Sequence, residues 1–280
     1  MARRLLATIA VCMGCAATVA NAGGAGGPGA GVQQGWDGLA NGAVRYVAVP
    51  AVDSTAIEVI RRQDGRVLRF MALKGTWGIP VVAFDGTADG LMGDGRTLLL
   101  GEATAGPTLR KHSTFALVDV KKMKVVRKLR LPGHQVFDAL SPDGRYFYFV
   151  EYVSAQDFTR YRVRAYDLHA GRLLAQPVTD KRESESAMQG APISRVTSGD
   201  RSWAYTLYGG SDKTFIHALD TMHAGAVCVD LPWKSQPKHL FEFRIRRAGD
   251  GRLVVRGPRG RTLAVVDQNN LHVVSAVRVP

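Results

Sequence analysis

The chain has 280 residues, and 46% of them are apolar, which is enough for one large all-β domain or two small ones. It carries 37 basic and 24 acidic residues, a formal net charge of +13 that favours anionic partners, although an arginine bias that only solubilises the protein would look the same. With three cysteines, two of them close to the N-terminus, an internal disulfide framework is excluded for the rest of the chain.

Residues 1–22 have the order of features that is typical of a secretory signal peptide. Arg3 and Arg4 precede an apolar stretch of about fifteen residues, shorter than the roughly 20 that span a bilayer. The small residues of Ala20-Asn21-Ala22 then predict cleavage near Ala22. We therefore expect a secreted, extracytoplasmic protein whose mature chain has no transmembrane segment. An uncleaved membrane anchor and a lipoprotein modified at Cys15 are the alternatives.

The mature chain begins with a segment that predicts a linker. Residues 23–35 are rich in glycine and hold no charge, which favours a flexible connection to the domain that follows. From residue 36 to residue 280 no convincing amphipathic helix occurs, and short β-rich runs alternate with turn residues. Cys228, left alone after cleavage, lies in an apolar run, so we expect a buried and inert thiol.

A turn built on Asp, Gly and Arg recurs along the chain, and each copy is followed by an apolar run. The four copies are Gly93–Arg96, Pro142–Arg145, Ser198–Arg201 and Gly249–Arg252, and their aspartates are 49, 57 and 50 residues apart. Asn41-Gly42 is a degenerate earlier copy. Because Gly accepts positive φ and Asp bonds its own backbone, such turns favour tight hairpins.

A second aspartate follows each turn at a similar spacing. Asp119, Asp167, Asp220 and Asp267 each end an apolar run and precede a further turn and strand. Two landmarks in phase predict a repeated four-stranded unit. The recurring Asp and Gly residues are therefore expected to build turns and not an active site.

These units predict an all-β fold, a single β-propeller of five four-stranded blades, with six blades as the alternative. Isolated four-stranded sheets of this size leave apolar faces uncovered, and stacking them around an axis covers those faces. The expected blades are residues 36–77, 78–132, 133–189, 190–237 and 238–280. The segment Leu140–Phe149, with its Ser-Pro-Asp-Gly-Arg core, resembles the signature of the WD40-like, TolB-like and YVTN-type bacterial β-propeller repeat proteins. The resemblance implies the fold more firmly than any activity.

Polar side chains near the expected central channel are the candidate site. If the protein is an enzyme, His134, Asp138 and Glu242 are the catalytic candidates, because acid/base or metal chemistry needs such groups converging from different blades. For ligand binding the candidates are His134, Gln135, Trp77 and Arg244. The competing interpretation is that each caps a turn or bonds a neighbouring backbone group. The scattered histidines and the lack of nucleotide-binding motifs predict no metal site and no cofactor.

Two basic regions of the sequence are candidate surfaces for binding an anionic partner. Residues 121–130 hold six cations and no acid on an expected outermost strand, where they would either dock an anion or block sheet-to-sheet aggregation. Arginines also cluster between Arg244 and Arg261, and few exposed aromatics accompany them, so nucleic acid is an unlikely partner. We expect a monomeric binding module for a protein, a polysaccharide or an anionic wall polymer. The alternative is a lactonase-like hydrolase or lyase with a polar site in the channel.

Overall fold

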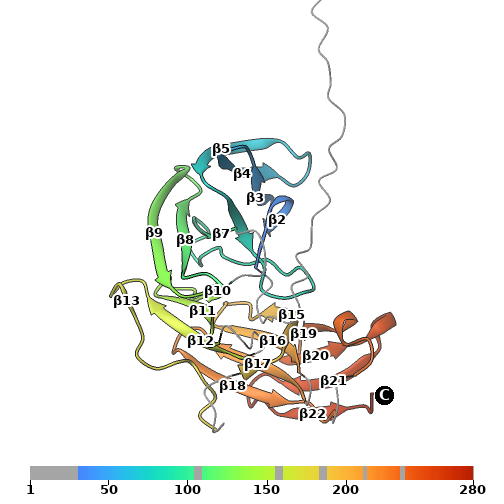
Figure 1. Ribbon diagram of the computed structural model, residues 1–280. Helices are drawn as coiled ribbons and strands as arrows, with labels where there is room; N and C mark the ends of the chain where they lie inside the picture. Colours follow the sequence, from blue (N-terminus) through green and yellow to red (C-terminus); the bar gives the residue numbers. More distant parts are fainter. Residues whose placement is uncertain are drawn as a thin grey trace, which may run out of the picture.

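The computed structural model describes residues 31–103, 109–154, 160–182, 188–210, 213–233 and 237–279. Within these residues the chain folds into five antiparallel sheets that follow one another in sequence order (Figure 1). No helix in the described ranges is long and apolar enough to cross a membrane. The expected signal peptide and residues 23–30 of the expected linker lie outside the described residues.

Each sheet is formed by consecutive strands. The first contains β2 (Gly35–Asn41), β3 (Val44–Pro50), β4 (Ser54–Arg61) and β5 (Val67–Lys74). The second contains β6 (Trp77–Pro80), β7 (Thr97–Glu102), β8 (His112–Asp119) and β9 (Lys124–Pro132), with β1 (Val32–Gln33) added beside β6. The third contains β10 (Gln135–Leu140), β11 (Tyr146–Tyr152), β12 (Arg160–Asp167) and β13 (Arg172–Leu173), and β14 (Met188–Gln189) also pairs with β12.

The remaining two sheets complete the described fold. The fourth contains β15 (Ala191–Thr197), β16 (Trp203–Gly209), β17 (Thr214–Asp220) and β18 (Gly225–Asp230). The fifth contains β19 (Arg244–Ala248), β20 (Arg252–Arg256), β21 (Thr262–Asp267) and β22 (Val273–Ala276), and two short 3₁₀ turns are η1 (Leu240–Glu242) and η2 (Pro258–Gly260). The prediction of an all-β fold with five propeller blades is confirmed.

The Asp-Gly-Arg turns join the first two strands of a blade, as their residue types predict. In the third sheet Asp143 Oδ1 accepts hydrogen bonds from the Arg145 N–H at 3.0 Å and from the Ser141 hydroxyl at 2.5 Å. Gly144 has φ of 72°, the left-handed conformation that glycine adopts without a Cβ clash. The motif aspartate therefore shapes the backbone and is not free for chemistry.

The second aspartate of each unit caps the next turn. Asp167 Oδ1 accepts the N–H groups of His169 and Ala170, and its Oδ2 accepts from the Arg145 side chain at 3.2 Å. The backbone N–H of Ala170, followed by Arg145, holds the pKa of Asp167 below its ordinary value. Asp119 repeats the arrangement with Arg96 in the second sheet. One motif residue thus ties the first turn of a blade to the second.

The hydrophobic core lies between neighbouring sheets. Separate clusters of buried side chains join the first sheet to the second, the second to the third, the third to the fourth and the fourth to the fifth. Phe147 is fully buried between the second and third sheets, where its ring lies 4.9 Å from that of Phe115. Among the described residues no such cluster joins the fifth sheet to the first. No core cluster among the described residues covers the outer face of either end sheet, and Phe70 on the first sheet is 68% exposed.

Replacing Phe147 with Ala is expected to lower the free energy of unfolding by about 3–5 kcal/mol, because the cavity left between two sheets cannot collapse. Phe70→Ala is the matched control, and we expect a change within about 0.5 kcal/mol because its ring is exposed. Urea unfolding followed by circular dichroism measures both. A large loss for Phe70→Ala would show that the outer face of the first sheet is covered in solution.

Candidate functional site

Charged residues occupy the same position on three neighbouring inner strands or their extensions. Asp89, Asp138 and Arg195 each lie five residues before the turn aspartate of their unit, and Trp36 and Ile245 hold this position in the first and fifth units. Successive sheets bring equivalent positions together around the axis. The middle of the molecule therefore contains two carboxylates and a guanidinium group.

Asp138 and Arg195 form a buried ion pair between the third and fourth sheets. The register of β10 against β11 shifts between Phe137 and Ala139, which places Asp138 at a β-bulge. Arg195 donates to Asp138 Oδ1 and to the Asp138 backbone carbonyl, and its Nε donates to the Thr206 hydroxyl at 2.7 Å. The side chains are only 1% and 4% exposed. Such a pair is costly to break, because the partner left behind would be an unpaired buried charge.

The neighbouring histidine carries no charge at neutral pH. Burial lowers the pKa of His217 to about 4, and its Nε2 has no hydrogen-bond partner among the described residues. His217 therefore adds no charge beside the Asp138–Arg195 pair.

A ten-residue excursion of the second sheet reaches the fourth sheet. Residues 81–90 extend away from the second sheet after β6 and fold back on themselves through a bridge between Val81 and Ala88. The chain returns to the sheet at Leu91, which forms a bridge with Leu98 of β7. At the tip, Phe84 N–H donates to the Pro192 carbonyl at 2.8 Å and Asp85 N–H donates to the Ile193 carbonyl at 3.1 Å. The excursion therefore lies along the inner strand β15.

Arg201 links the turn of the fourth sheet to this excursion. Its Nη2 donates to Asp89 Oδ1 at 2.7 Å, and the two side chains are 28% and 14% exposed. Arg201 has φ of 64°, so it occupies a left-handed conformation that costs an L-residue roughly 1–2 kcal/mol. A strained residue of this kind persists only where surrounding contacts fix it, and such residues cluster at ligand-binding sites.

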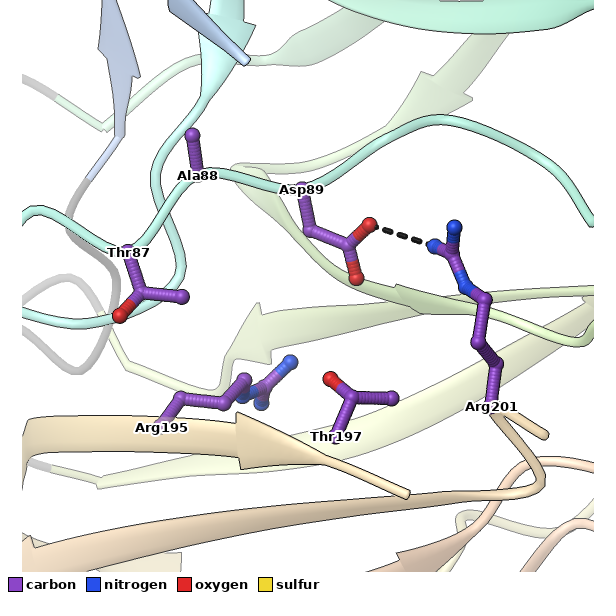
Figure 2. Close-up of a pocket in the computed structure, with 6 residues that line it drawn as sticks. All are labelled: Thr87, Ala88, Asp89, Arg195, Thr197 and Arg201. Atoms are coloured by element: carbon purple, nitrogen blue, oxygen red, sulfur yellow. Dashed lines mark hydrogen bonds and ion pairs between the residues drawn. The ribbon is translucent and has the colours of Figure 1, made fainter. Parts of the chain in front are cut away.

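A cavity of about 230 Å³ lies between the excursion and β15 (Figure 2). Its walls are formed by Thr87, Ala88, Asp89, Arg195, Thr197 and Arg201. The guanidinium groups of Arg195 and Arg201 lie on opposite sides of the Thr197 side chain, and Asp89 faces them from the excursion (Figure 2). Hydrogen-bond donors and one carboxylate thus share a small concave space.

The three catalytic candidates do not share a partner. His134 Nδ1 accepts the Arg110 N–H at 3.3 Å, and burial, followed by the charge of Arg110, lowers the pKa of His134 to about 4. Glu242 is exposed in η1, where its Oε1 pairs with His239 Nδ1 at 2.8 Å. No hydrogen bond or ion pair among the described residues joins His134, Asp138 and Glu242. Nor does any group of three or more His, Cys, Asp or Glu in the described ranges gather as a metal site requires.

Two of the four ligand-binding candidates have structural roles in the connections between sheets. Trp77 Nε1 donates to the Lys74 carbonyl at 2.9 Å, and Gln135 Nε2 donates to the Pro132 carbonyl at 2.7 Å, three residues back in each case. Their backbone N–H groups donate to equivalent hydroxyls, those of Thr55 and Ser113. Both side chains are buried, so the structure does not present them to a ligand.

Arg244, the last ligand-binding candidate, lies at the start of β19. Its Nη1 donates to the carbonyls of Phe241 and Phe243, at 2.9 and 2.8 Å. Strand pairing places Arg244 opposite Arg256 on β20. Arg244 is therefore part of the basic surface of the fifth sheet and not of the central cavity.

The basic run of residues 121–130 lies on β9 and on the turn before it. Within the second sheet β9 pairs only with β8, so it is an edge strand. Arg127 Nη1 donates to the Leu168 carbonyl of the third sheet at 2.5 Å, and Lys128 lies over the Trp77 ring. Cations on an edge strand oppose sheet-to-sheet pairing, so a structural role accounts for part of this run.

One pattern in the sequence points to this part of the molecule. The fixed offset of five residues before the turn aspartate selects Asp89, Asp138 and Arg195 together. Nothing local selects Arg201, because its partner Asp89 lies 112 residues away in the chain.

No family model and no curated protein matches the chain. In structure it is similar to dihydro-heme d1 dehydrogenase NirN, with a TM-score of 0.52 and 12% identity over 90% of this chain and 47% of that one. It also resembles TolB from Acinetobacter baumannii (TM-score 0.42, 14% identity, 81% and 49% covered) and the Dos1 propeller (0.46, 10%, 81% and 55%). The chain spans about half the length of these structures. At such identities the likeness shows the β-propeller fold alone.

Replacing Arg195 with Met is expected to lower the free energy of unfolding by about 3–5 kcal/mol, because Asp138 would be left buried and unpaired. The double variant R195M/D138L should recover most of that loss, since it removes both charges. Arg61→Met, which breaks an exposed pair with Asp64, is the control and should change stability by less than about 1 kcal/mol. Equal losses in the single and double variants would contradict the assigned pairing.

Proposed function

We propose that this protein is an exported, non-catalytic propeller that binds an anionic polysaccharide through the outer face of its fifth sheet. The observation that carries the proposal is the composition of residues 244–261, which hold seven arginines, no lysine and one acid, Asp250. A surface of one sign attracts a polymer of the opposite sign and raises the rate of encounter.

Strand pairing places four of these arginines on one face. Arg244 lies opposite Arg256, and Ala248 lies opposite Arg252, so these residues share a face with Arg246. The other face carries Ile245, Leu253 and Val255, which are buried against the fourth sheet. We call the face formed by Arg244, Arg246, Arg252 and Arg256 the arginine face. Among the described residues, no core cluster covers it.

The residue type favours carboxylate or sulfate groups repeated along a chain. Arginine presents a planar fork of donors that matches an oxyanion with two hydrogen bonds, whereas lysine is a hydrated point charge. The Arg256 fork is oriented by the Gly260 carbonyl, to which Nη1 donates at 3.1 Å. Export, which the N-terminal sequence predicts, would bring this face among anionic polymers outside the cell. The hydrolase alternative has no comparable support, since its three candidate residues have separate partners.

Retention on immobilised polygalacturonate tests the proposal, with neutral dextran as the reference matrix. Replacing Arg246, Arg252 and Arg256 with Ser should weaken binding of the purified chain by about tenfold or more, because each lost ion pair contributes roughly 0.5–1 kcal/mol. Raising the ionic strength should weaken binding of the unmodified chain in the same way.

Replacing Lys121, Lys122 and Lys124 with Ser is the matched control, because it removes the same charge from the second sheet. This variant should keep most of the affinity. Equal losses in both triple variants would mean that net charge, and not the arginine face, governs binding. Retention on single-stranded DNA that exceeds retention on polygalacturonate would also contradict the proposal.

A further inference from the structure

We propose that the cavity between the excursion of residues 81–90 and β15 is a second binding site, which takes a small free α-amino acid. Arg195 and Arg201 would hold the carboxylate, and Asp89 would hold the ammonium group. This site is separate from the arginine face of the fifth sheet and does not depend on it.

Comparison with the previous repeat shows that Arg201 occupies a different turn position from Arg145 and bonds a different partner. Ser198 and Ser141 make the same contact, each donating its hydroxyl to the turn aspartate two residues on. That correspondence places Arg201 where the previous repeat has Gly144, and places Ser202 where it has Arg145. Arg145 pairs with the second aspartate of its own blade, whereas Arg201 pairs with Asp89 of the excursion. An arginine at a glycine position therefore serves a contact outside its own turn.

The cavity walls hold donors that the fold does not use. A guanidinium group has five N–H donors. Arg195 directs three of its bonds to Asp138 and Thr206, and Arg201 directs one to Asp89. Both arginines line the cavity, and Figure 2 shows the Arg195 guanidinium beside the Thr197 side chain and the Arg201 guanidinium beside Asp89. These groups match the two oxygens of a carboxylate.

Asp89 supplies an acceptor on the opposite wall. Its Oδ1 accepts from Gly90 N–H and from Arg201, at 2.7 Å in each case. No hydrogen bond to Oδ2 is found among the described residues, and Figure 2 shows this second oxygen directed toward Arg195 and Thr197. A carboxylate oxygen in this place suits an ammonium group.

Charge balance and size narrow the class of ligand. Asp89, Asp138, Arg195 and Arg201 carry no net charge together, so a zwitterion adds no uncompensated charge, whereas a simple anion or cation would. The cavity of about 230 Å³ is smaller than the roughly 300–1,000 Å³ of sites for drug-sized ligands. A small α-amino acid meets both conditions.

Calorimetric titration of the purified chain with L-alanine, acetate and ethylamine tests this site. L-alanine should bind saturably and at least about tenfold more tightly than acetate or ethylamine, because each of these lacks one of the two charged partners. Acetate binding as tight as that of L-alanine would overturn the assignment to an amino acid. A lack of saturable heat with all three ligands would overturn the site itself.

Two variants probe the two walls separately. Arg201→Gly restores the glycine of the repeat, so it should fold at least as stably as the unmodified chain and bind L-alanine at least about tenfold more weakly. Asp89→Asn should remove most of the preference for L-alanine over acetate. If Arg201→Gly keeps its thermal stability and binds L-alanine unchanged, the proposal is wrong.

Arg246→Ser is the control, because it alters the arginine face and leaves the cavity intact. It should bind L-alanine as the unmodified chain does, while Arg201→Gly should keep its retention on polygalacturonate. The two proposals can therefore fail independently.

Discussion

The ion pair between Asp138 and Arg195 fixes the inner strands of the third and fourth sheets against each other. Because both groups are buried, each is tolerable only while the other is in place. The same strand, β15, accepts hydrogen bonds from the excursion of the second sheet and receives the Ile245 N–H of the fifth sheet on its Ser194 hydroxyl. The second, third and fifth sheets thus all contact β15 of the fourth sheet. The cavity lies where the excursion of the second sheet crosses this strand.

The turns and the number of blades could be predicted from the sequence because their causes are local. Asp143 and Gly144 shape the hairpin through contacts within a few residues, so the residue types alone indicate the conformation. The roles of Trp77 and Gln135 do not follow from local sequence. A polar or aromatic residue at the start of an inner strand could bind a channel ligand or bond a carbonyl three residues back, and only the fold distinguishes the two.

The site itself depends on contacts that span the chain. The excursion of residues 81–90 reads as an irregular loop, and nothing near it shows that its tip lies on β15. Arg201 reads as the last residue of an Asp-Arg turn, although it occupies the glycine position of that turn. His134 and Glu242 have suitable chemistry for catalysis, yet each is satisfied by a neighbour. The residue type of such a side chain suggests its chemistry, but contacts distant in the sequence determine its partners.

The two basic regions of the sequence, residues 121–130 and 244–261, form different kinds of surface. On β9 the cations lie along a sheet edge, where Arg127 bonds a carbonyl of the next sheet. On the fifth sheet the arginines lie on a face that no described core cluster covers. In the fold described here, the uncovered face follows from the absence of a core between the fifth and first sheets.

Modification of arginines by phenylglyoxal, mapped by mass spectrometry, tests this account most directly. We expect Arg246, Arg252 and Arg256 to react quickly in the free protein and to become protected by polygalacturonate, while Arg195 stays unreactive throughout. Slow modification of Arg246 and Arg256 in the free protein, at the rate of Arg195, would contradict the account, because it would mean that the arginine face is buried.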